Sequence, residues 1–83
     1  MKLTDAQRQG LEAVRGGKAY RIYRSHGNTM HAESVGAATL WKLESLQLIR
    51  DGQTHNPGAF QVRVPLELTD TGRKALWHEE AQK

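Results

Sequence analysis

The chain has 83 residues, and its 12 lysines and arginines exceed its 9 aspartates and glutamates, which gives a net charge of +3 at pH 7. This length predicts one small domain with a thin core, and the absence of cysteine excludes a disulfide scaffold, a cysteine zinc site and a cysteine nucleophile. Nothing resembles a signal peptide or an apolar membrane span, so we expect a cytoplasmic protein with no membrane partner. The cationic excess favours a polyanionic partner.

The first predicted helix spans residues 5–15. Thr4 is a favourable N-cap, and Gln7 stands three positions after it, which is the spacing of a capping box. Gly10 lies beside the apolar face and would permit close packing against a neighbouring element. The glycine pair at 16–17 is expected to end the helix.

A strand is expected over residues 18–24, because tyrosine and isoleucine there favour extended structure. Residues 25–28 have the composition of a turn. The stretch from 29 to 33 has two interpretations: a second hairpin strand, or a short helix of the kind that precedes a recognition helix. The sequence does not decide whether residues 25–36 form a helix or a strand.

The next helix is predicted over about residues 37–47, with Gly36 as N-cap and Ser34 as the rival cap. Its leucines share one side, and small, polar and aromatic residues share the other. The inward positions are Leu40, Leu43 and Leu46, and the outward positions are Ala38, Trp41, Lys42 and Ser45.

A turn-rich polar loop follows over residues 51–59, and residues 60–68 then alternate strictly between apolar and polar. This alternation predicts a strand with one buried and one wet face. Pro65 cannot donate to a ladder, which favours an edge at that position. A final helix should begin after Thr69. The candidate core residues are Leu3, Leu11, Val14, Ile22, Leu40, Leu43, Leu46, Ile49, Phe60, Val62, Val64, Leu66, Leu68 and Leu76.

Two segments resemble parts of a winged helix-turn-helix domain of the MarR and PadR type found in bacterial and phage regulators. Residues 37–50 are similar to its recognition helix with the following Leu-Ile ending, and residues 66–73 look like the LTxxGR signature that closes its wing. The resemblance implies a mixed α/β (α+β) fold with three helices, a small antiparallel sheet and a β-hairpin wing. Gln47 replaces the usual glycine, and residues 17–36 do not spell a clear supporting helix, so we expect a reduced form.

The resemblance also implies which residues contact DNA. The outward face of the recognition helix would enter the major groove, and the wing, at about residues 51–60, would reach the backbone or minor groove. The helix contributes Ala37, Ala38, Trp41, Lys42 and Ser45, and the wing contributes Gln53, Thr54, His55 and Asn56, with Arg50 and Arg63 at its base. Independently of the resemblance, Lys18, Arg21 and Arg24 on the first strand form the most basic local group and are further candidate contacts. The alternative for each of these groups is an ordinary solvated surface.

We therefore expect a homodimeric transcriptional regulator that binds double-stranded DNA. The alternative is a protein-interaction winged helix that binds a host protein through the Trp41 face, and a third reading is a nonspecific nucleic-acid binder. A basic stripe from Arg21 and Arg24 to Lys42 would favour DNA, whereas an apolar patch around Trp41 would favour protein. Trp41 itself is predicted to be at least half buried.

The sequence contains no H-E-x-x-H metal pattern, no serine nucleophile motif and no Gly-rich phosphate loop. We expect a protein that is not an enzyme and needs no cofactor or metal.

Overall fold

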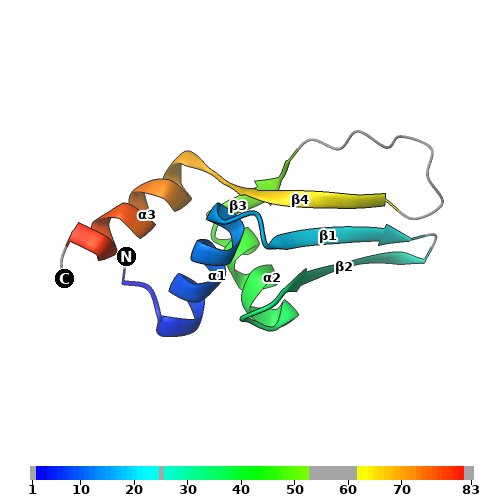
Figure 1. The fold of residues 1–83 in the computed structure, drawn as a ribbon, viewed down its shortest axis with the longest axis horizontal. Helices are drawn as coiled ribbons and strands as arrows, with labels where there is room; N and C mark the ends of the chain where they lie inside the picture. The colour runs from blue at the N-terminus through cyan, green and yellow to red at the C-terminus, as the bar shows by residue number, and fades with distance from the viewer. Residues whose placement is uncertain (1, 25, 53–61, 82–83) are drawn as a thin grey trace.

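The computed structural model describes residues 2–24, 26–52 and 62–81. Within these residues the chain forms an α+β fold of three helices and a four-stranded antiparallel sheet, with the helices gathered at one end of the strands (Figure 1). The sheet has the order β2-β1-β4-β3. In chain order the elements are α1 (Asp5–Arg15), β1 (Ala19–Arg24), β2 (Gly27–Ala32), α2 (Ala37–Ser45), β3 (Ile49–Asp51), β4 (Val62–Leu68) and α3 (Asp70–Ala81).

The predicted boundaries of α1 are confirmed, and its ends show why. Thr4 Oγ1 accepts the backbone N–H of Gln7 at 3.1 Å, and the Gln7 side chain accepts the Thr4 N–H at 3.0 Å, so the capping box is complete. At the other end Gly17 has a positive φ of 75°. This conformation lets Lys18 N donate to Ala13 O at 2.8 Å, which closes the helix.

Residues 27–32 are a strand, which settles the question that the sequence left open. β2 pairs with β1 along its whole length, from Ala19 opposite Ala32 to Arg24 opposite Gly27. Met30 and Ala32 are buried while His31 between them is exposed, so this segment has the period of a strand. The supporting helix of a helix-turn-helix is therefore missing from the described fold, and a β-hairpin stands in its place.

Pro65 does not mark an edge strand, because β4 lies between β1 and β3. Its position is instead where the described part of the ladder with β3 ends. β4 pairs with β3 only as far as Leu66 opposite Asp51. At the next step Gly52 N donates to Pro65 O at 2.7 Å, and proline has no N–H with which to return a bond. Gly52 is the last described residue on this side of β4, and the opposite side of β4 pairs with β1.

The core lies between one face of the sheet and the helices. Most of the predicted core residues are buried, whereas Ile22 and Leu46 are only half buried, and Phe60 and the side chain of Val62 lie outside what the structure describes. The core also contains residues that the alternation did not single out. The buried apolar residues are Leu3, Leu11, Ala13, Val14, Ala19, Met30, Ala32, Leu40, Leu43, Leu48, Ile49, Val64, Leu66, Leu68 and Leu76.

The end of α2 is held by a left-handed residue, although that residue is not glycine. Gln47 has a φ of 61°, and this lets Leu48 N donate to Leu43 O at 3.0 Å and Gln47 N donate to Glu44 O at 2.9 Å. These two bonds form the Schellman motif that usually requires glycine. The helix ends at Ser45, two residues before the predicted limit.

The LTxxGR stretch fixes the start of α3 against this same turn. Thr69 Oγ1 donates to Gln47 O at 2.6 Å and accepts the N–H of Gly72 at 3.0 Å. Thr69 N donates to Leu48 O at 3.1 Å. A Cβ on Gly72 would lie 2.0 Å from Leu48 O, so only glycine fits there. Arg73 donates to Leu68 O at 3.1 Å. The motif thus joins the start of α3 to the α2–β3 turn through hydrogen bonds and a close backbone contact.

Candidate nucleic-acid interface

The outward face of α2 is exposed and its first turn is open. Leu40 and Leu43 are fully buried, whereas Ala38, Lys42 and Ser45 on the opposite side are exposed. Gly36 is the N-cap, as predicted, and no side chain of the described residues caps the helix. The first backbone N–H groups of α2 thus have no side-chain acceptor there. Ser45 Oγ donates to Lys42 O at 2.7 Å, which leaves the hydroxyl oxygen as an acceptor.

Trp41 lies on the flank of α2 that faces the sheet. The centre of the Arg21 guanidinium is 5.2 Å from the centroid of the Trp41 rings, close enough for a cation–π contact. The tryptophan is 41% exposed. The prediction that it is at least half buried is therefore confirmed within the monomer, and an exposed edge remains on the α2 surface.

Arg21 is the centre of an ion cluster that joins β1, α2 and β3. Its guanidinium pairs with Glu44, lies 3.2 Å from Asp51 Oδ1 and donates to Tyr23 Oη at 3.2 Å. Tyr23 in turn donates its hydroxyl proton to Asp51. Burial lowers the pKa of Arg21, but the hydrogen bonds with Tyr23 and Glu44 and the charges of both carboxylates outweigh burial and raise it above its ordinary value. The arginine is held in its charged form.

This placement corrects the candidate contact set, because Arg21 is not available to a phosphate. The residue is only 8% exposed and is already neutralised by two carboxylates. Alternation along β1 points it to the core face together with Ala19. Its role is to tie α2 to the sheet.

The other cations of the candidate set lie on the opposite, open face of the sheet or at its rim. Arg24, Arg63 and Lys18 are exposed and form no ion pair with described residues, whereas Arg50 Nε binds Glu67 Oε1 at 2.7 Å. The open face looks away from the core and therefore away from α2. The basic stripe from Arg21 and Arg24 to Lys42 is not formed.

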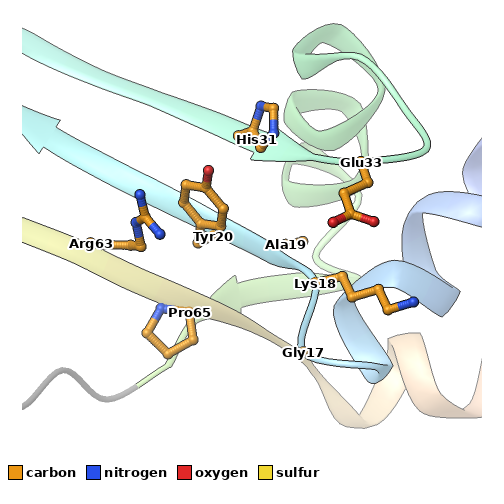
Figure 2. A pocket seen from close by; sticks show the side chains of 8 residues that line it. All are labelled: Gly17, Lys18, Ala19, Tyr20, His31, Glu33, Arg63 and Pro65. Carbon is orange, nitrogen blue, oxygen red and sulfur yellow. The ribbon is translucent and has the colours of Figure 1, made fainter.

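An open hollow of about 520 Å³ lies at the α1-proximal end of this open face. Figure 2 shows Tyr20 beside His31, with Arg63 on the next strand and Lys18 and Glu33 at the other end of the hollow. The Tyr20 and His31 ring centroids are 5.3 Å apart, and the Arg63 guanidinium lies 4.3 Å from the centroid of the Tyr20 ring. The lining residues are Gly17, Lys18, Ala19, Tyr20, His31, Glu33, Arg63 and Pro65.

The predicted wing tip, comprising Gln53, Thr54, His55 and Asn56, lies outside the described residues. The structure thus brings together Ala37, Ala38, Trp41, Lys42 and Ser45 on α2, and separates them from Lys18, Arg24, Arg50 and Arg63.

Sequence reasoning missed three features of this surface. It did not pair Glu44 and Asp51 with Arg21, although an inward-facing arginine on a strand requires carboxylate partners. It assigned no role to Tyr20, whose alternation with Ala19 places it on the open face. It also passed over Trp77, which is 69% exposed on α3.

Within the described part of the chain, no group of three or more His, Asp or Glu side chains could hold a metal ion. None of the helices seen there has the length and hydropathy to cross a membrane. No protein-family model, curated protein or solved structure matches the chain.

Proposed function

We propose that the protein binds double-stranded DNA through the outward face of α2, as the small transcriptional regulator that its resemblance to winged helices implies. The observation that carries this proposal is the exposed, uncapped first turn of α2 with Lys42 one turn further along the same face. A helix N-terminus attracts phosphate oxygens because its N–H groups and dipole point outward.

Small side chains at the start of α2 support this role. Ala37 and Ala38 leave the backbone of the first turn accessible, so a duplex can approach it closely. Lys42 then suits a phosphate or the acceptor edge of guanine, and Ser45 can accept a hydrogen bond from a base. These residues cover only part of a half-site, so we propose that two copies of the chain bind together.

The Arg21 cluster fixes the direction in which this face points. Arg21 joins β1 to Glu44 of α2 and Asp51 of β3, and Gly10 of α1 packs directly against Leu43. A recognition element held on rigid supports loses little entropy when it binds.

The test is duplex binding measured by fluorescence anisotropy over a range of salt concentrations. We expect the affinity to fall linearly on a log–log plot with a slope of about −0.9 per phosphate contact. Lys42→Ala should weaken binding and reduce the magnitude of the slope by about one. Lys74→Ala, which removes an exposed lysine from α3, is the matched control and should bind like wild type. Equal affinities for these two variants would contradict the proposal.

A second candidate is a protein partner that docks on Trp41. The supporting observation is that the exposed edge of Trp41 has a neutralised arginine beneath it, and Lys42 is the one lysine or arginine within α2. Tryptophan often dominates protein interfaces. Under this reading Trp41→Phe would abolish capture of the partner and leave duplex affinity unchanged.

A further inference from the structure

The open face of the sheet carries flat side chains on three adjacent strands. His31 on β2, Tyr20 on β1 and Arg63 on β4 project from the same face, as the register of the two ladders requires. None of the described helices packs on this face, since the buried residues of all the strands are on the other one. No described helix therefore covers these three groups.

The three groups lie in contact along the face. The Arg63 guanidinium lies over the Tyr20 ring, 4.3 Å from its centroid, and the centroid of the His31 ring on the neighbouring strand lies 5.3 Å from that of Tyr20, with the two rings tilted by 44°. Tyr20 supports one side of the guanidinium, and Arg63 is exposed to solvent. A planar guanidinium over an aromatic ring is a surface on which an unpaired base stacks well.

The charge on this face identifies the class of ligand. Arg50 is neutralised by Glu67, so the remaining cations are Arg24, Arg63 and Lys18, against Glu33 as the one carboxylate at the rim of the hollow. The excess is positive and lies beside stacking groups. Flat groups flanked by cations that have no ion pair among the described residues suit a chain of bases joined by phosphates, and do not suit an apolar or cationic partner.

We propose that this open face binds single-stranded nucleic acid, with bases stacked on Arg63 and His31 and phosphates held by Lys18 and Arg24. In a duplex the faces of the bases are covered by their neighbours, so stacking groups favour a single strand. The surface lies on the side of the sheet opposite to α2, and the proposal does not depend on duplex binding by α2.

The experiment measures binding of a fluorescein-labelled oligo(dT) of about 12 nucleotides, a length within the range that one small domain tracks. Fluorescence anisotropy is recorded for the wild type and for Arg63→Gln, Arg63→Lys and Tyr20→Leu, with Lys74→Gln as the charge-matched control. Thermal unfolding by circular dichroism shows that each variant is folded. Because Arg63 is exposed, its two substitutions should disturb folding least.

We expect Arg63→Gln to weaken oligonucleotide binding about tenfold, because it removes both a charge and a stacking plane. Arg63→Lys keeps the charge and should still weaken binding several-fold, since an ammonium group offers no plane for stacking. Tyr20→Leu should weaken it similarly, because Arg63 loses its support. Lys74→Gln should change it less than about twofold.

The proposal would be overturned if folded wild-type protein bound no oligonucleotide, if Arg63→Gln bound no more weakly than Lys74→Gln, or if Arg63→Lys bound like wild type. Failure of this proposal is distinct from failure of duplex binding. Lys42→Ala reports on α2 and should leave oligo(dT) affinity unchanged, and Arg63→Gln should leave duplex affinity nearly unchanged. If Lys42→Ala alone lowered oligo(dT) affinity, the open face would not be the site.

Discussion

Gly72→Ala tests whether the contact between α3 and the α2–β3 turn holds the fold together. Gly72 is the third residue of α3, within a helix where alanine is intrinsically favoured over glycine by about 1 kcal/mol. Helix propensity alone therefore predicts a more stable protein. The packing predicts the opposite, because the new Cβ would lie 2.0 Å from Leu48 O and 3.0 Å from Leu48 C.

The size of the effect follows from what must move. Ordinary contact begins at 3.4 Å, so α3 or the turn must shift by about 1.4 Å, the difference between 3.4 and 2.0 Å. A shift of that size breaks the bonds from Thr69 N to Leu48 O and from Thr69 Oγ1 to Gln47 O. Losing two hydrogen bonds costs about 1 kcal/mol each, and overpacking costs about 2 kcal/mol more. Together these costs exceed the gain of about 1 kcal/mol in helix propensity. We expect a net loss of about 3 kcal/mol.

Urea unfolding followed by circular dichroism measures this loss, and the melting temperature should fall by about 10 °C or more. The matched control is Gly16→Ala, where φ is −81° and the nearest atom to the new Cβ lies at an ordinary 3.4 Å. That variant should be as stable as wild type or slightly more stable. If Gly72→Ala were as stable as Gly16→Ala, the contact between α3 and the α2–β3 turn would not be needed for the stability of the fold.

Three further substitutions probe the end of α2, the Arg21 cluster and an exposed ion pair between β3 and β4. Gln47→Gly should raise the free energy of unfolding by about 0.5–1 kcal/mol, because glycine adopts the φ of 61° without strain. An unchanged midpoint of urea unfolding would show that Gln47 is not strained at the end of the helix. Arg21→Met should lower the free energy of unfolding by about 3–5 kcal/mol, because Glu44 and Asp51 would face each other without a cation. Adding Glu44→Gln and Asp51→Asn to that variant should recover part of the lost stability. If urea unfolding placed Arg21→Met within about 1 kcal/mol of wild type, the cluster would have no structural role. Arg50→Ala removes an exposed ion pair and should change stability by no more than about 0.5 kcal/mol, which the same measurement checks.

Local signals in the sequence predicted several elements correctly because each rests on neighbouring residues. The capping box of Thr4 and Gln7 fixed the start of α1. The alternation between residues 60 and 68 gave the faces of β4 correctly over the described part, with Val64, Leu66 and Leu68 buried. In both cases the responsible contacts are made within a few residues or set by one periodicity.

One element that the sequence left undecided and two predictions that were wrong depend on partners that are distant in the chain. β2 contains glycine, asparagine and histidine, which have little strand propensity, and it is stabilised by pairing with β1. The position of Pro65 was misread because the sequence does not reveal that β1 lies on one side of it and Gly52 on the other. Arg21 was expected at the surface, since its burial makes sense only once Glu44 and Asp51 are known to converge on it.

A titration of ¹⁵N-labelled protein with duplex DNA, followed by NMR at low and moderate salt, shows whether α2 presents a duplex-binding surface. If α2 binds the duplex, the amide signals of Ala37, Ala38, Lys42 and Ser45 shift first, and the shifts shrink as salt is added. Shifts confined to Tyr20, His31 and Arg63 on the open face, or no shifts at all from a folded protein, would contradict it.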